Sequence, residues 1–175
     1  MTLALVALAL TLSIQAAEAP SKGDACTLPS GLREALHQRF GSARVLKSAD
    51  LYEDERGLFQ KEHSGACPGI ARGQFFGSGQ RPAIALVLLQ VEPKKNLRLV
   101  VARPALSAWT FVEVDELDQG STAVVGRKGP GTYTDLPSAT ARSTNNDAVT
   151  LTGYESWQRV YIWNGRTFDR VQVVN

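Results

Sequence analysis

The chain has 175 residues, a formal net charge of +2 and 43% hydrophobic residues. This length is enough for one domain with a hydrophobic core. The small net charge, with basic residues scattered along the chain rather than gathered with aromatic residues into a stripe, argues against a nucleic-acid partner.

The N-terminal residues have the pattern of a secretory signal peptide. Residues 3–14 form the apolar run LALVALALTLSI, which is too short to cross a bilayer because a spanning helix needs about 20 residues. Small residues follow the run, so residues 1–17 are predicted to be removed by cleavage near Ala16 or Ala17. Residues 18–175 are then expected to form one periplasmic or secreted domain without a membrane span. An uncleaved anchor or a core segment is the alternative for residues 3–14.

The two cysteines, Cys26 and Cys67, are predicted to form a disulfide, since an even pair in an exported chain usually does so. In the chain-entropy model, closing a loop of about 40 residues stabilises the folded state by about 3–4 kcal/mol. A zinc ligand or a catalytic thiol is the alternative. One nearby histidine, His63, is too few to complete a structural zinc site with two cysteines.

An N-terminal helix is predicted near residues 31–40. Ser30 can cap this helix and Gly41 can end it. Four apolar residues fall on one face at helical spacing: Leu32, Ala35, Leu36 and Phe40. The acidic segment Asp50–Arg56 that follows is expected to be a turn, ended by Gly57.

Beyond the helix, alternating and β-branched residues predict short strands. The predicted strands are Arg44–Lys47, Leu58–Lys61, Ile70–Phe76, Ala83–Val91, Leu97–Arg103, Trp109–Leu117, Thr122–Gly126, Ala148–Gly153, Trp157–Trp163 and Arg166–Val174. Turns at Pro93–Asn96 and Asn164–Gly165 predict two antiparallel hairpins. The section Arg127–Asp147 contains GPG, a further proline and the polar tract STNND, and is expected to be a long loop.

The segment GQFFGSGQRPAIALVLL at residues 73–89 resembles the repeat unit of the FG-GAP and VCBS families, in which a glycine-rich turn precedes a buried strand. With CPG at Cys67–Gly69 and WNGxxF at Trp163–Phe168, the chain resembles a group of small exported bacterial proteins, mostly uncharacterised, that contain one such degenerate unit. The resemblance implies an antiparallel sheet like a propeller blade or half-barrel, and it implies no reaction. We therefore expect a mainly β (α+β) fold with one N-terminal helix.

The metal-binding form of that turn carries acidic or amide oxygens at alternating positions, which here are Gln74, Phe76, Ser78 and Pro82. Calcium needs about six to eight oxygen ligands, several of them carboxylates. We therefore expect no calcium at this turn, and the sequence nominates no metal or cofactor elsewhere.

The sequence nominates no catalytic residue. Ser78 in GSG lacks the spacing of a nucleophile elbow. The acidic clusters Glu53–Glu55 and Glu113–Asp118 are expected to be solvated, with Asp115 facing outward. A hydrolase that uses His63 as its base is the least favoured alternative, because the sequence offers no nucleophile for it.

Aromatic residues gather near the C-terminus and form the candidate binding surface: Tyr154, Trp157, Tyr161 and Trp163. Such residues suit a binding hot spot, and they equally fill the core of a small sheet. Alternation places Tyr161 and Trp163 on one strand face and Val160 and Ile162 on the other. The expected function is non-catalytic binding of a protein or a cell-envelope component. An inhibitor or immunity-type protein acting on an envelope hydrolase is the alternative.

Overall fold

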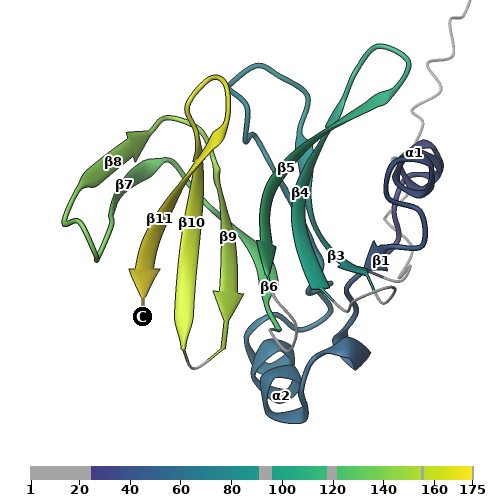
Figure 1. The fold of residues 1–175 in the computed structure, drawn as a ribbon, viewed down its shortest axis with the longest axis horizontal. Helices are drawn as coiled ribbons and strands as arrows, with labels where there is room; N and C mark the ends of the chain where they lie inside the picture. Colours follow the sequence, from purple (N-terminus) through teal and green to yellow (C-terminus); the bar gives the residue numbers. More distant parts are fainter. Residues whose placement is uncertain (1–24, 91–95, 118–121, 155, 175) are drawn as a thin grey trace, which may run out of the picture.

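A computed structural model describes residues 25–90, 96–117, 122–154 and 156–174 (Figure 1). The predictions for residues 1–17 and 93–95 lie outside these ranges. In chain order the elements are α1 (Ser30–Phe40), β1 (Arg44–Val45), a 3-10 turn (Ser48–Asp50), α2 (Glu53–Glu62), β2 (Ile70–Gly73), β3 (Ala83–Gln90), β4 (Asn96–Pro104), β5 (Trp109–Leu117), β6 (Val124–Lys128), β7 (Gly131–Thr134), β8 (Ala141–Thr144), β9 (Ala148–Gly153), β10 (Trp157–Trp163) and β11 (Phe168–Val174). The predicted β-rich, antiparallel fold is confirmed, and its sheets do not close into a barrel.

Two antiparallel sheets face each other across the main core. The first sheet has the order β1–β3–β4–β5, with β2 also paired to β3, and the second has the order β11–β10–β9–β6. Along one side the sheets are joined, because the Val125 N–H of β6 donates to the Pro68 carbonyl oxygen just before β2 (2.9 Å). Figure 1 shows α1 outside the first sheet and the β7–β8 hairpin outside the second. The domain is therefore built of four layers.

β3 is buried on both faces, which accounts for its unbroken apolar run. Its odd-numbered residues from Ala83 to Leu89 belong to the core between the sheets. Its even-numbered residues from Ile84 to Leu88 pack with Leu32 of α1. The predicted antiparallel pairing of β3 with β4 is confirmed. A strand covered by a sheet on one side and a helix on the other has no polar face to display.

The C-terminal hairpin of β10 and β11 is also confirmed. Its turn contains Gly165 at φ +100°, a backbone conformation that glycine adopts without strain. The turn closes where the Asn164 N–H donates to the Thr167 carbonyl oxygen (3.0 Å). As alternation predicts, β10 directs Tyr161 into the core between the sheets and Val160 to the opposite face.

The prediction of a long loop at Arg127–Asp147 is wrong. β6 continues to Lys128, and β7 and β8 then pair as a hairpin over the outer face of the second sheet. Val160 and Ile162 of β10 are buried on that face, with Tyr133 of the hairpin packed against them. The apolar outer face therefore explains the hairpin, because a sheet face of this kind must be covered.

The second prediction that fails is the acidic turn at Asp50–Arg56 with a strand at Leu58–Lys61. These residues form the helix α2, so the domain has two described helices rather than one. Three acidic residues occupy the first turn of α2, where the helix dipole favours negative charge. Phe59 on its inner face is 3% exposed. Within the described residues, neither helix is long and apolar enough to cross a membrane.

Asp115 does not face outward as predicted. The register of β4 and β5 shifts, so that Leu99 opposes Asp115 while Val100 opposes Glu113. Val114 is therefore the extra residue of a β-bulge, and a bulge turns the side chains beyond it to the other face. The Asp115 carboxylate consequently reaches the second sheet, where it accepts hydrogen bonds from the Tyr161 hydroxyl and from Arg159 (3.1 Å).

Candidate functional site

The glycine-rich turn at residues 73–82 directs aromatic rings into the core. Phe75 is fully buried and Phe76 is 7% exposed. The Phe76 ring packs edge-on against Trp163, with 4.8 Å between ring centroids. Asp147 holds the turn itself, accepting a hydrogen bond from the Gln74 backbone N–H (2.8 Å). In the part of the chain that the structure describes, no group of three or more His, Cys, Asp or Glu residues is placed to hold a metal ion.

The four aromatic residues predicted as a binding surface differ in their surroundings. Tyr161 is 1% exposed, and its hydroxyl donates to Asp115. Burial and this carboxylate raise the pKa of Tyr161. Trp157, Trp163 and Tyr154 are partly buried and pack against the core between the sheets. Their exposed edges are what a partner could contact.

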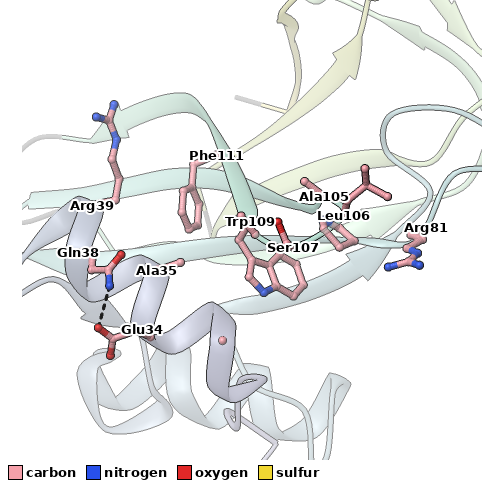
Figure 2. Close-up of a pocket in the computed structure, with 13 residues that line it drawn as sticks. Glu34, Ala35, Gln38, Arg39, Arg81, Ala105, Leu106, Ser107, Trp109 and Phe111 are labelled. Carbon is pink, nitrogen blue, oxygen red and sulfur yellow. Dashed lines mark hydrogen bonds between the residues drawn. The ribbon is translucent and has the colours of Figure 1, made fainter.

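A groove of about 840 Å³ lies between α1 and the turn that joins β4 to β5 (Figure 2). We call it the helix groove; the turn lines it with residues 104–109, and α1 lines it with Gly31, Glu34, Ala35, Gln38 and Arg39. Trp109 and Phe111 of β5 supply aromatic surface to it. Phe111 is fixed by an edge-on contact with Phe40 of α1, with ring centroids 5.4 Å apart.

The indole of Trp109 has an unused hydrogen-bond donor. Figure 2 shows this ring lying between α1 and the β4–β5 turn. Its N–H has no acceptor among the described residues, and the ring is only partly buried. Gly31 has no side chain, so the space beside the nitrogen is open. A Cβ atom at position 31 would occupy that space in van der Waals contact with the nitrogen, 3.7 Å away. A partner that brings a carbonyl oxygen into the helix groove can therefore accept this hydrogen bond.

Leu106, at the tip of the β4–β5 turn, forms the rim of the helix groove and is 102% exposed. The turn beneath it is ordered by a hydrogen bond from the Ala105 N–H to the Ala108 carbonyl oxygen (2.8 Å). Arginines stand at the two ends of the groove in Figure 2. Arg39 pairs with Glu113 (3.2 Å), whereas Arg81 has no ion pair within the described residues.

Sequence reasoning misses the helix groove because its parts come from three distant segments. One signal was available: PALSA between two strands places a large apolar residue, Leu106, in a turn where polar residues are usual.

A second hollow, of about 440 Å³, lies where the C-terminal end of α2 meets the second sheet. We call it the α2 cavity; Glu62, His63 and Tyr154 line it together with residues of β6, β9 and β10. The His63 Nε2 atom lies 3.8 Å from a Glu62 carboxylate oxygen, and its ring rests on Phe59 with centroids 5.3 Å apart. Tyr154 donates a hydrogen bond to Glu62 (3.4 Å).

The α2 cavity brings His63 close to the Glu62 carboxylate. His63 makes no hydrogen bond to a hydroxyl group within the described residues. The predicted disulfide between Cys26 and Cys67 is present, so neither sulfur is a free thiol. Nucleophilic catalysis needs a nucleophile within hydrogen-bond reach of its base. The hydrolase alternative stays a prediction.

We expect Tyr154 to ionise only in strongly alkaline solution. Burial of the hydroxyl, together with the negative charge of the Glu62 carboxylate, raises the pKa of Tyr154 from 10.0 to about 12. Because the folded-state pKa lies above the unfolded one, the protonated hydroxyl stabilises the fold below about pH 10, and this contribution is lost as the pH rises through about 12. A near-ultraviolet absorbance titration of wild type minus Tyr154→Phe measures this ionisation, and a difference curve centred near pH 10 would contradict it.

No protein-family model matches this chain, and no curated protein or solved structure is significantly similar to it. The resemblance to FG-GAP and VCBS repeats therefore stays a prediction from the sequence.

Proposed function

We propose that this protein is an exported, non-catalytic binding module that docks a protein partner in the helix groove. The observation that carries the proposal is the fully exposed Leu106 beside the partly buried Trp109, whose indole N–H has no acceptor among the described residues. A partner segment in the groove would cover the apolar residue and accept the hydrogen bond together.

The groove has the chemistry of a binding hot spot. Tryptophan and arginine are enriched among residues that dominate binding energy, especially where a pocket excludes water around them. Burying a leucine side chain such as Leu106 contributes about 1.5–3 kcal/mol. The guanidinium group of Arg81, which has no ion pair within the described residues, favours a partner segment with an acidic residue beside an apolar one.

Export is part of the proposal, and two features support it. Residues 3–14 and the alanines after them have the pattern of a signal peptide. The disulfide between Cys26 and Cys67 is of the kind that persists in oxidising compartments such as the periplasm. An envelope partner is consistent with both features.

Photo-crosslinking tests the groove directly. We expect a photoreactive phenylalanine analogue at position 106 to give a discrete protein adduct in cells that naturally produce this chain. Leu106→Asp should lower recovery of the same partner at least tenfold, because a charge would replace the buried apolar contact. Leu106 is fully exposed, so neither change disturbs the core.

The matched control is Leu136, an exposed leucine on the connection between β7 and β8. Leu136→Asp should leave recovery unchanged, and the analogue at position 136 should not give the same adduct. The absence of any adduct at position 106, or equal yields at both positions, would contradict the proposal. An adduct with an envelope hydrolase would favour the inhibitor or immunity-type alternative within the same groove.

A further inference from the structure

The α2 cavity lies apart from the helix groove and carries charged groups on two sides. We propose that it binds a small zwitterion of the α-amino acid class, with the ligand carboxylate at Lys128 and the ligand ammonium group at Glu62. The α2 cavity and the helix groove are lined by different residues. The two proposals can therefore fail separately.

A hydrogen-bonded row of polar side chains forms the sheet side of the cavity. Lys128 of β6 donates to the Gln158 side-chain oxygen (2.7 Å), and the Gln158 amide nitrogen donates to the Thr152 hydroxyl (2.9 Å). The Lys128 ammonium has three donors. It has no carboxylate within 4.0 Å in the described part of the chain, so its positive charge is not neutralised by an ion pair.

Arg127, which also lines the cavity, does not offer its charge in the same way. Its guanidinium is paired with Asp147 (3.4 Å). Lys128 is therefore the cation that the sheet presents to a ligand carboxylate.

Thr150 provides an unused hydroxyl group. The residue is 5% exposed and lines the cavity, yet its hydroxyl has no hydrogen-bond partner within the described residues. Gly126 on the neighbouring strand keeps this hydroxyl open, because a Cβ atom there would lie 2.6 Å from the Thr150 Oγ1 atom. A ligand oxygen or ammonium group in the cavity can form a hydrogen bond with this hydroxyl.

The α2 side of the cavity has the opposite charge. Glu62 presents a carboxylate that is oriented by the Tyr154 hydroxyl (3.4 Å) and flanked by His63 Nε2 (3.8 Å). A simple anion would leave Glu62 without a counter-charge and place a second negative group beside it. A neutral sugar would leave the Lys128 charge uncompensated. A ligand with both charges complements the two sides of the cavity.

Calorimetry on the disulfide-bonded protein tests the ligand class. We expect glycine, alanine or serine to bind with a dissociation constant below a millimolar, and their N-acetyl and carboxamide derivatives to bind at least tenfold more weakly. No heat with any of these amino acids would overturn the proposal. So would equal binding of the N-acetyl derivatives, which would indicate a plain anion site, or stronger binding of glucuronate, which would indicate a sugar-acid site.

Variants of the two charged residues test the placement. Lys128→Met and Glu62→Gln should each weaken binding of the amino acid at least tenfold. Lys61→Met and Glu53→Gln are the matched controls, since both residues lie on α2 outside the cavity lining, and they should bind as wild type does. Equal affinity of Lys128→Met and Lys61→Met would overturn the proposal.

Amide chemical shifts of the unmodified protein give a readout that does not depend on how the variants fold. Addition of the amino acid should shift the signals of residues 126–128 and 150–152 most. Shifts confined to other parts of the chain would place the ligand elsewhere and overturn the proposal.

Discussion

Phe75→Ala is expected to lower the free energy of unfolding by about 3–5 kcal/mol, the range observed when a buried phenylalanine is truncated. Phe75 has no exposed surface and lies in the core between the two sheets. Gly73 packs so closely that a Cβ atom there would lie 2.8 Å from the Phe75 ring. Strands of two sheets surround the cavity left by the ring, so the cavity cannot readily collapse. Urea denaturation followed by tryptophan fluorescence measures the loss.

Ser78→Ala in the same turn is the control. Ser78 is exposed, so its replacement should change the free energy of unfolding by no more than about 0.5 kcal/mol. If both variants lost the same stability, the backbone of the turn rather than the Phe75 ring would carry the effect. A loss below about 1 kcal/mol for Phe75→Ala would contradict its position in the core.

The glycine-rich turn contacts the C-terminal hairpin through Phe76. Phe76, at a position where the sequence predicts no metal ligand, packs against Trp163 and Phe168. We infer that the turn stabilises the domain by joining the end of β2 to the C-terminal hairpin through aromatic contacts. That role requires buried rings.

Local sequence patterns are sufficient to predict those elements whose conformation is decided by neighbouring residues in the chain. The apolar run of β3 and the Asn164–Gly165 turn of the C-terminal hairpin both correspond to elements in the structure. In each case the residues that decide the conformation are adjacent in the chain, so their spacing can be read directly.

Elements that depend on distant partners could not be predicted in this way. The polar stretches of β7 and β8 form a hairpin because Val160 and Ile162, far along the chain, require a cover. α2 has few apolar residues and contains Gly57, so its helical pattern is weak. Asp115 turns inward through a one-residue register shift that alternation alone does not reveal.

The same distinction applies to the candidate sites. The helix groove combines α1, Arg81 and the β4–β5 turn, and the α2 cavity combines α2 with three strands of the second sheet. Neither set forms a motif in the sequence. The sequence singled out His63 and Tyr154, which line the α2 cavity, but not the residues of β6 and β9 that complete it. The disulfide could be predicted because the chain contains just two cysteines.

Removing that disulfide is expected to have the second large effect. Cys26 and Cys67 are separated by 41 positions in the sequence. For a loop of this length the chain-entropy model gives a stabilisation of about 4 kcal/mol. The double variant Cys26→Ala/Cys67→Ala should therefore unfold at a much lower urea concentration. Wild type under reducing conditions should match it, and a difference below about 1 kcal/mol between oxidised and reduced protein would contradict the expectation.

Loss of the disulfide should destabilise α1 before the rest of the domain. Cys67 is 5% exposed within the cluster that holds Leu32 and Leu36 against the first sheet, and Cys26 lies just before the helix. Without the bond, α1 is retained by this apolar contact and by the exposed Arg39–Glu113 ion pair, so its amides should exchange with solvent faster than those of β3 at urea concentrations where the sheet is still folded. Since α1 forms one wall of the helix groove, the reduced protein should also lose its crosslink at position 106 before it unfolds. Retention of that crosslink in a protein whose α1 amides exchange freely would show that the partner contacts the β4–β5 turn alone.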